Sequence, residues 1–371
     1  MNQFAVSDFV NALWAIFSVT LLIVRTRIVS PSKKQSNNNF EQIKNSLVTQ
    51  TLLSVIVPAR NEANNIANCL ASLVSQIVDF NYEIIIVDDQ STDATFAIAN
   101  QFKKARVISG VERPQGWRGK QWACAQGAEA SQGKYLLFTD ADTQHEPHCL
   151  QQSIQTLISQ KADLLTAIPF LIHKSFWQKL TGPLHLFAFS FLAPACIPRH
   201  NRVFAIGQFL LFSRTAYNSI GGHSTVKNTL VEDVDLGQLM LKSNFKIYVE
   251  NKMHWYNTKM YDTWTDFVAG WRRNIRAGLL RADFLTSFYD FVYVAGLNIA
   301  WLQLFHKYNF AIAIMLVLFL IYRLKNLGQY HFLGTLFIPI SSAILFFITS
   351  LSVFDIVFNR PLKWKARSYE S

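Results

Sequence analysis

The sequence predicts an α/β protein with a doubly wound, mostly parallel sheet and with transmembrane helices at its N- and C-terminal ends. Two observations predict this class. Short aliphatic segments alternate with helix-length segments between residues 52 and 139, and such crossovers place helices on both faces of a parallel sheet. Long uncharged runs stand near both ends of the chain, outside this alternation, and such runs are typical of membrane helices.

The elements of the sheet follow from the places where aliphatic runs stop at polar turns. We expect strands over residues 53–58, 82–87, 106–108 and 134–139. Between them we expect helices over residues 64–76, from 94 to about 104, and over 120–129. The second strand is nearly continuous in Ile and Val, as central parallel strands are. Sheets of this kind bind ligands beyond the carboxyl ends of their strands.

The composition excludes several classes of protein. Of the 371 residues, 50% are hydrophobic and only 16% are charged, which excludes a disordered chain. The four cysteines form no C-x-x-C pair, which argues against a disulfide frame or a zinc site. His145 lacks metal-ligand spacing, and we expect His223 to pack or to cap a helix. The basic excess behind the net charge of +11 gathers at the edges of apolar runs, which favours anionic lipid and predicts no nucleic-acid partner.

The N-terminal end predicts a membrane anchor. Sixteen uncharged residues separate Asp8 from Arg25, without the basic start and the small-residue cleavage site of a signal peptide. Basic residues follow this run at once, and the positive-inside rule places what comes after them on the cytoplasmic side. We therefore expect an anchor over residues 1–27, a polar linker over 28–50 and a cytoplasmic folded domain over 51–283.

The C-terminal end predicts a membrane region over residues 284–358 and a basic cytoplasmic tail over 359–371. The apolar runs behind this prediction are residues 291–306, 308–322 and 326–354. Because the domain and the tail both carry cytoplasmic charge, an even number of crossings is needed, so we expect the first run at the interface and the other two as a hairpin. An uncharged stretch near 180–198 contains three prolines, and we expect it to lie in the membrane surface.

Acidic residues gather at the carboxyl ends of the expected strands. Asp88 and Asp89 follow the second strand, Asp140 and Asp142 follow the fourth, and Glu62 lies after the first. Each turn alone is as well explained by turn and helix-capping chemistry. Together, however, these carboxylates repel one another unless a cation or hydrogen-bond donors compensate. A hard divalent cation that bridges to substrate phosphates is the natural partner of Asp142.

No glycine-rich phosphate loop accompanies these acids. Neither G-x-x-x-x-G-K-[ST] nor G-x-G-x-x-G occurs, which disfavours P-loop and dinucleotide-binding proteins. The comparable place is Arg118-Gly119-Lys120, before an expected helix. Lys120 is either a phosphate contact or a solvated surface lysine, and the residues themselves leave both readings open.

Seven short motifs follow one another along the folded domain. They are VPARNE (57–62), VDDQSTD (87–93), GWRGKQWA (116–123), TDAD (139–142), GQFLLFSRTAY (207–217), VEDVDLG (231–237) and GWRRN (270–274). In this order and spacing they resemble family-2 glycosyltransferases with the GT-A fold. The terminal apolar segments and the final PLKWKARSY resemble membrane glycosyltransferases of carotenoid and hopanoid pathways, such as the diaponeurosporenoate and myxol glycosyltransferases. The resemblance implies an inverting hexosyltransferase that uses Mg²⁺ or Mn²⁺ and a nucleotide-sugar donor.

The resemblance also implies a role for each matching residue. The donor-binding residues that it implies are Pro58, Ala59, Glu62, Asp89, Lys120 and Asp140. Among these, Asp89 would hold the base, Lys120 would lie near the nucleotide, and Asp140 would face the sugar and ribose. Asp142 would hold the metal on the diphosphate, and Asp233 would be the catalytic base.

One motif departs from the family pattern. The Gln-x-x-Arg-Trp of polysaccharide synthases is absent, and Trp271-Arg272-Arg273 stands at its approximate place, which argues against processive polymerisation. Trp271, Arg272 and Arg273, together with Glu232, are candidate contacts to the diphosphate or the acceptor. The two arginines are equally well explained as basic residues that anchor the domain to lipid.

The function expected from the sequence is transfer of a sugar from a nucleotide-diphosphate donor to a hydroxyl or carboxyl of a membrane lipid, a carotenoid or another isoprenoid. The base takes the acceptor proton, and the metal neutralises charge on the leaving diphosphate. One alternative is a glycolipid or polysaccharide-precursor transferase with a polyprenyl or glycan acceptor. The non-enzyme alternative is an inactive membrane scaffold, which the acidic clusters disfavour because their repulsion costs stability and serves no scaffold.

Overall fold

The structure is a computed structural model. It describes residues 52–173, 175–181, 205–250, 254–259, 261, 263–281, 318, 338–360, 362–364 and 367–369. The expected anchor and linker over residues 1–50, almost all of the stretch near 180–198, and the turn of the expected hairpin at 323–325 lie outside the described residues.

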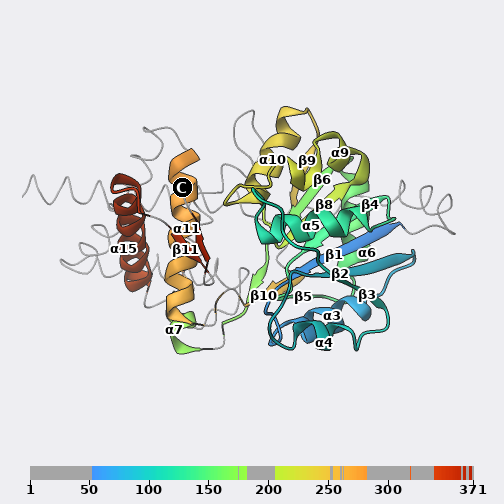
Figure 1. Cartoon of the computed structure of the whole chain (residues 1–371), viewed down its shortest axis with the longest axis horizontal. Helices are drawn as coiled ribbons and strands as arrows, with labels where there is room; N and C mark the ends of the chain where they lie inside the picture. Colours follow the sequence, from blue (N-terminus) through green and yellow to red (C-terminus); the bar gives the residue numbers. More distant parts are fainter. Residues whose placement is uncertain are drawn as a thin grey trace, which may run out of the picture. The chain divides into compact units, whose positions relative to one another are not determined.

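The central sheet of the described residues has seven strands in the order β3-β2-β1-β4-β8-β6-β9 (Figure 1). Its strands are β1 Leu53–Ala59, β2 Tyr82–Asp88, β3 Ala105–Ser109, β4 Tyr135–Thr139, β6 Leu164–Ala167, β8 Phe209–Ser213 and β9 Ile247–Glu250. β8 runs antiparallel to its neighbours β4 and β6, and the other pairs are parallel. The predicted mixed α/β class with a mostly parallel sheet is therefore confirmed.

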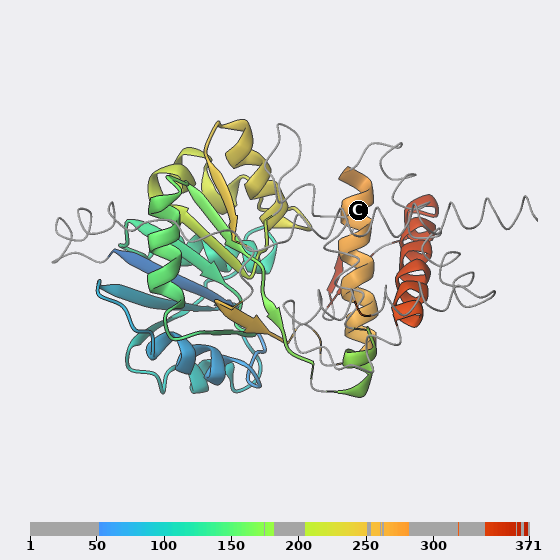
Figure 2. The same cartoon turned by 180° about the vertical axis from the view of Figure 1, so that it is seen from behind.

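Helices cover both faces of this sheet because successive side chains of each strand point to opposite faces. Val55 and Val57 of β1 belong to a core that includes α3 (Ile66–Val74) and α6 (Cys149–Ser159). Ile56, between them, belongs to a second core that includes α5 (Gly119–Glu129). Figure 1 shows α5 in front of the sheet, and Figure 2, seen from behind, shows α6 in front of it. The sheet is thus buried on both faces, as its aliphatic strands predict.

The predicted elements agree with the structure except at some of their ends. The helix expected from residue 94 to about 104 ends early, as α4 Thr95–Ala99, because turns at residues 100–104 redirect the chain into β3. The sequence reading did not specify α6, β6, β8 or β9. It also did not specify β5 Thr143–His145, β7 Phe170–Leu171, α7 Phe176–Thr181, α9 Arg214–Ser219, the 3₁₀ helix η2 Gly222–Ser224, α10 Glu232–Lys242 and β10 Tyr256–Thr258. A small second sheet has the order β5-β10-β7.

The chain divides into two compact units. One comprises Pro31–Phe170 and Ala195–Lys259 and contains the central sheet, as far as these residues are described. The other contains α7, α11 (Trp264–Arg281) and α15 (Ile338–Val357). The sequence interpretation ended the folded domain at residue 283, whereas the structure groups α11 with the C-terminal helices.

Within the second unit, α11 and α15 pack side by side (Figure 1). The Arg272 guanidinium forms an ion pair with the Asp355 carboxylate, and the Ser352 hydroxyl donates to the Arg272 carbonyl oxygen at 3.3 Å. Among the described residues, one helix is long and apolar enough to cross a membrane, Pro339–Val357. Its exposed side chains include Ile340, Phe347 and Phe354.

Candidate active site

Several predicted site residues of the first unit lie where strands β1, β2 and β4 end. Ala59 is the last residue of β1 and pairs with Asp88, the last residue of β2. The Asp89 amide donates to the Ala59 carbonyl oxygen at 2.8 Å, and Asp140 follows β4 directly. Because β1 is parallel to both β2 and β4, the three turns share one edge of the sheet, as the sequence predicts.

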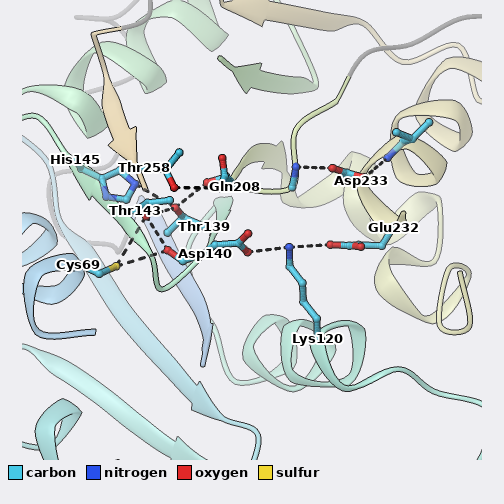
Figure 3. A network of polar contacts seen from close by, with 12 residues as sticks. Cys69, Lys120, Thr139, Asp140, Thr143, His145, Gln208, Glu232, Asp233 and Thr258 are labelled. Carbon is cyan, nitrogen blue, oxygen red and sulfur yellow. Dashed lines mark hydrogen bonds and ion pairs between the residues drawn. The ribbon is translucent and has the colours of Figure 1, made fainter. Parts of the chain in front are cut away.

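An ion-pair cluster joins one of these residues, Asp140, to two other predicted residues, Lys120 and Glu232 (Figure 3). The Lys120 ammonium lies 2.8 Å from Asp140 Oδ1 and 2.8 Å from Glu232 Oε1. Lys120 comes from the first turn of α5, Asp140 from the turn after β4, and Glu232 from the first residue of α10. Lys120 is therefore no solvated surface lysine, and the structure shows it bridging two carboxylates from distant parts of the chain.

The charges of this cluster shift one another's pKa values. Burial acts to lower the pKa of Lys120, but the two carboxylates outweigh it and hold that pKa well above its usual value. Burial also acts to raise the pKa of Glu232, but Lys120 outweighs it and brings that pKa down to about 2. Burial raises the pKa of Asp140 despite Lys120, and Glu232 and Glu62 add to the rise. Glu62 is thus within electrostatic reach of the cluster.

Asp233 lies beside this cluster and is held by two backbone amides. The Gly207 N–H donates to Asp233 Oδ2 at 2.7 Å, and the Val234 N–H donates to Oδ1 at 2.8 Å. Burial and the neighbouring Glu232 carboxylate raise the pKa of Asp233 to about 6, although Lys120 acts in the opposite direction. A carboxyl with a pKa near the operating pH is suited to general-base catalysis.

Gly207 lies where Lys120, Glu232 and Asp233 come together. A Cβ at that position would lie 3.1 Å from Lys120 Nζ, 3.2 Å from Asp233 Oδ2 and 3.3 Å from Glu232 Oε1. Any side chain there would therefore crowd all three charged groups. The glycine lets the backbone amide approach the Asp233 carboxylate while the ammonium stays within reach of Glu232.

A buried chain of hydrogen bonds supports the turn that carries Asp140. The Thr143 hydroxyl donates to the Asp140 carbonyl oxygen at 2.7 Å, and the Thr139 hydroxyl donates to the Gln208 carbonyl oxygen at 2.8 Å. His145 Nε2 lies 3.2 Å from the Thr139 hydroxyl oxygen. Since the Thr139 proton is already committed, His145 must donate, which assigns the Nε2–H tautomer. Burial lowers the pKa of His145 to about 3, so the ring is neutral at physiological pH.

Hydrogen bonds through Thr258 also connect the turn after β4 to the loop before β8. Gln208 Nε2 donates to the Thr258 hydroxyl at 3.2 Å, and that hydroxyl donates to the Asp142 carbonyl oxygen at 3.4 Å. Gln208 follows Gly207, whose amide holds Asp233. Two consecutive residues thus connect the predicted base to the predicted D-x-D turn (Figure 3).

The expected nucleotide pocket contains a further ion pair. Asp89 lies 3.5 Å from Arg60, and burial raises the pKa of Asp89 although Arg60 opposes the rise. The Glu62 amide donates to the Thr95 hydroxyl at 2.7 Å, and a Glu62 carboxylate oxygen accepts from the Asn65 side chain at 2.8 Å. These bonds fix the loop after β1 beside the start of α4.

Three predicted contacts lie in the other unit. Trp271, Arg272 and Arg273 all belong to α11. The Arg272 guanidinium is engaged by Asp355, a partner that neither sequence interpretation anticipated, and Arg273 donates to the Asn274 side-chain oxygen at 3.1 and 3.2 Å. Their roles as diphosphate or acceptor contacts stay predictions.

Sequence reasoning missed Gly207 and His145 as parts of the site. Gly207 begins one of the quoted motifs, but its amide contact to Asp233 depends on a loop that meets α10 only in the fold. His145 was dismissed for lacking metal spacing, and its role is instead to donate to Thr139. The expectation for His223 is confirmed, because its buried ring nitrogen Nδ1 bonds the Tyr217 hydroxyl at 2.8 Å.

The mostly parallel sheet, with acidic residues beyond the ends of its strands, is the arrangement of the GT-A fold. Residues 54–221 match the Glycosyl transferase family 2 description, so the chain carries a family 2 glycosyltransferase domain. A 4,4'-diaponeurosporenoate glycosyltransferase of Staphylococcus aureus strain N315 is 26% identical over an alignment of 315 residues, gaps included, which covers 77% of this chain and 81% of that protein. The protein of the same name from strain MRSA252 is 27% identical over an alignment of 239 residues, which covers 61% of each chain.

A solved structure shows the same fold. The mannosyltransferase PcManGT from Pyrobaculum calidifontis, in complex with GDP-Man and Mn²⁺, matches with a TM-score of 0.52 and 15% identity. The match covers 92% of this chain and 97% of that protein. At this identity the similarity establishes the GT-A fold, and the chemistry of this chain must be argued from its own residues.

Proposed function

We propose that the protein is a metal-dependent, inverting glycosyltransferase that moves a sugar from a nucleotide-diphosphate donor to a hydroxyl or carboxyl of a membrane lipid, a carotenoid or another isoprenoid. The observation that carries the proposal is the partly buried group of Lys120, Asp140, Glu232 and Asp233 beyond the strand ends. It combines a cation for a diphosphate with a carboxyl whose pKa of about 6 suits a base.

The residues of the D-x-D turn fit a divalent metal. Asp140 and Asp142 offer carboxylate oxygens, which hard cations such as Mg²⁺ and Mn²⁺ prefer. Burial raises the pKa of Asp140 although Lys120 opposes the rise, and Glu232 and Glu62 add to it, so a further cation would favour the ionised carboxylate. Within the described part of the chain, no group of three or more His, Cys, Asp or Glu side chains could hold a metal by itself. We therefore assign the metal to Asp142, with the donor diphosphate supplying further oxygens. When bound, the metal neutralises charge on the leaving diphosphate.

The chain's own residues supply the remaining steps. Each Asp233 oxygen accepts one backbone N–H and keeps a lone pair for the proton of the acceptor hydroxyl. The two amides fix the carboxylate, so the proton can be taken without reorganising the base. Lys120 and Asp140 stand on the donor side, where we place the diphosphate and the sugar with its ribose. Pro58, Ala59 and Asp89 frame the base end of the nucleotide.

The lipid acceptor and the membrane location rest on two further observations. The relatives reported above are named for an isoprenoid acid, 4,4'-diaponeurosporenoate. α15 carries large apolar side chains on its exposed surface, including Phe347 at 56% exposed and Val357 at 66%, and its segment Pro339–Val357 is long enough to span a bilayer. We propose that the second unit holds the catalytic domain at the cytoplasmic face of a membrane.

The proposal is tested by donor turnover. Detergent-purified protein with Mn²⁺ or Mg²⁺ should slowly release nucleoside diphosphate from one nucleotide sugar in a panel of common donors. A chelator should stop the release, and the Asp142→Asn variant should match the chelated wild type. Lipids and pigments extracted from a deletion strain should then lack one glycoside, which identifies the acceptor. No release from any donor, together with unchanged extracts, would favour an inactive scaffold.

A further inference from the structure

Lys120 occupies an unusual position among the charged groups of the site. Its ammonium contacts two carboxylates at 2.8 Å each, one after β4 and one at the start of α10. The side chains of Asp140 and Glu232 are 26% and 11% exposed and that of Lys120 is 35% exposed, so water screens these charges only in part. Without Lys120, the neighbouring carboxylates of Asp140, Glu232 and Asp233 would face one another with no positive charge among the contacts described here.

The ammonium can also be reached from solvent, because the Lys120 side chain is 35% exposed. A Cβ at Gly207 would lie 3.1 Å from Lys120 Nζ, so the glycine avoids a clash with the ammonium. A lysine carries three N–H donors on a flexible stem, and two of them are committed to carboxylates. The ammonium can therefore exchange one carboxylate for an incoming anion without the backbone moving.

We propose that Lys120 is the resident counter-ion of the donor site, which weakens the binding of a divalent metal alone and strengthens the binding of metal together with a diphosphate. This inference rests on the proposed function, because that function identifies the ligand as a nucleotide diphosphate. Without a donor, the ammonium neutralises Asp140 and repels a second cation next to Asp142. With the donor, Asp142 would hold the metal and Lys120 would contact the diphosphate, whose negative charge would attract both cations. Metal and diphosphate thus bind in a mutually dependent manner.

The test compares Lys120→Met with the wild-type chain in detergent, using Mn²⁺ alone as the first probe. Free Mn²⁺ is counted by electron paramagnetic resonance. Because the variant loses a positive charge near the carboxylates, it should bind Mn²⁺ alone about tenfold tighter or more. The second probe is UDP or GDP in the presence of saturating Mn²⁺. The same variant should bind whichever nucleotide the wild type retains about tenfold more weakly or worse.

Two further variants make the result decisive. Lys134→Met removes an exposed lysine elsewhere on the same domain and should leave both affinities unchanged. Lys120→Gln, whose amide still donates to carboxylates, replaces the methionine variant if that one does not fold. It too should bind Mn²⁺ alone more tightly and the nucleotide more weakly than the wild type does. Affinity for Mn²⁺ alone that is unchanged or weaker in the folded Lys120 variants would overturn the proposal. If the wild type binds neither nucleotide, the donor is not a UDP or GDP sugar, and the measurement with Mn²⁺ alone still tests the counter-ion.

Discussion

Replacing Asp233 with asparagine tests the assignment of the catalytic base. The amide keeps the shape of the carboxylate but cannot take the acceptor proton. Transfer to a hydroxyl acceptor should therefore fall by about 10²–10⁴-fold, the usual contribution of a general base. Donor binding should persist, because the contacts of Lys120 to Asp140 and Glu232 do not involve Asp233.

The pKa of about 6 for Asp233 adds a pH dependence to this prediction. The base works only when ionised, so the wild-type rate should be level above about pH 7 and fall tenfold per unit below pH 6. Asp233→Asn should lack this limb. Because the folded pKa lies above the ordinary value of 3.8, stability is lost as pH rises from about 4 to 6, by about 3 kcal/mol. The variant removes that loss but gives up one amide hydrogen bond, worth about 1 kcal/mol.

The assay is single-turnover transfer to an extracted lipid acceptor that offers a hydroxyl, with saturating donor, followed from pH 5 to pH 8. Asp235→Asn, two residues further along α10, is the matched control and should transfer at a near wild-type rate. The reasoning is refuted if Asp233→Asn retains the wild-type rate and its low-pH limb. If Asp235→Asn alone loses transfer, the base is Asp235 instead.

Three other predictions follow from the same structure. Asp142→Asn should abolish metal-dependent donor binding and leave the fold intact, since an amide packs like the acid but lacks the charge that a hard cation prefers; calorimetric titration of donor with metal checks this. Asp355→Asn should weaken the ion pair with Arg272 and lower the free energy of unfolding by about 1–3 kcal/mol, because the Asp355 side chain is only 2% exposed. The double variant Arg272→Met with Asp355→Leu should regain much of this stability, as measured by thermal unfolding. His145 has a folded pKa of about 3, below its unfolded value, so the wild type should lose stability as pH falls below 6.5, and His145→Gln should remove about 2 kcal/mol of that loss at pH 5. An unchanged pH profile in that variant would contradict the neutral, buried ring.

The sheet could be predicted because its strands carry a local signal. Runs such as 82–87 are aliphatic throughout and stop at polar turns, and parallel crossovers leave few alternatives. The antiparallel β8 could not be placed in the same way, since its position between β4 and β6 depends on pairing with strands distant in the sequence. The short α4 shows that the ends of helices are the least predictable part of a sequence interpretation, because the local turn, and not the hydrophobic periodicity, sets where a helix ends.

Only those site residues that directly follow strands could be placed from the sequence. Asp140 and Asp89 follow strands, so their edge of the sheet could be foreseen. The bond from Lys120 to Glu232 spans 112 positions along the chain, and no pattern in the sequence relates them. The ion pair of Arg272 was not predictable either, because its partner Asp355 lies in an otherwise apolar helix, α15, that the sequence assigned to the membrane region.

The protonation of Asp233 also bears on what the acceptor is. A hydroxyl acceptor must lose its proton as the new bond forms and therefore needs the base. A carboxylic acid acceptor is already ionised at neutral pH, so it needs no base, and the ionised Asp233 would repel it. Loss of transfer in Asp233→Asn should accordingly be large for a hydroxyl acceptor and small for a carboxylate, with the low-pH limb present only for the hydroxyl. A deep loss and a clear limb with a carboxylate acceptor would show that Asp233 acts by positioning and not by taking a proton. Because Gly207 and Val234 hold the two Asp233 oxygens in either case, the comparison changes the acceptor's chemistry and leaves the geometry of the base the same.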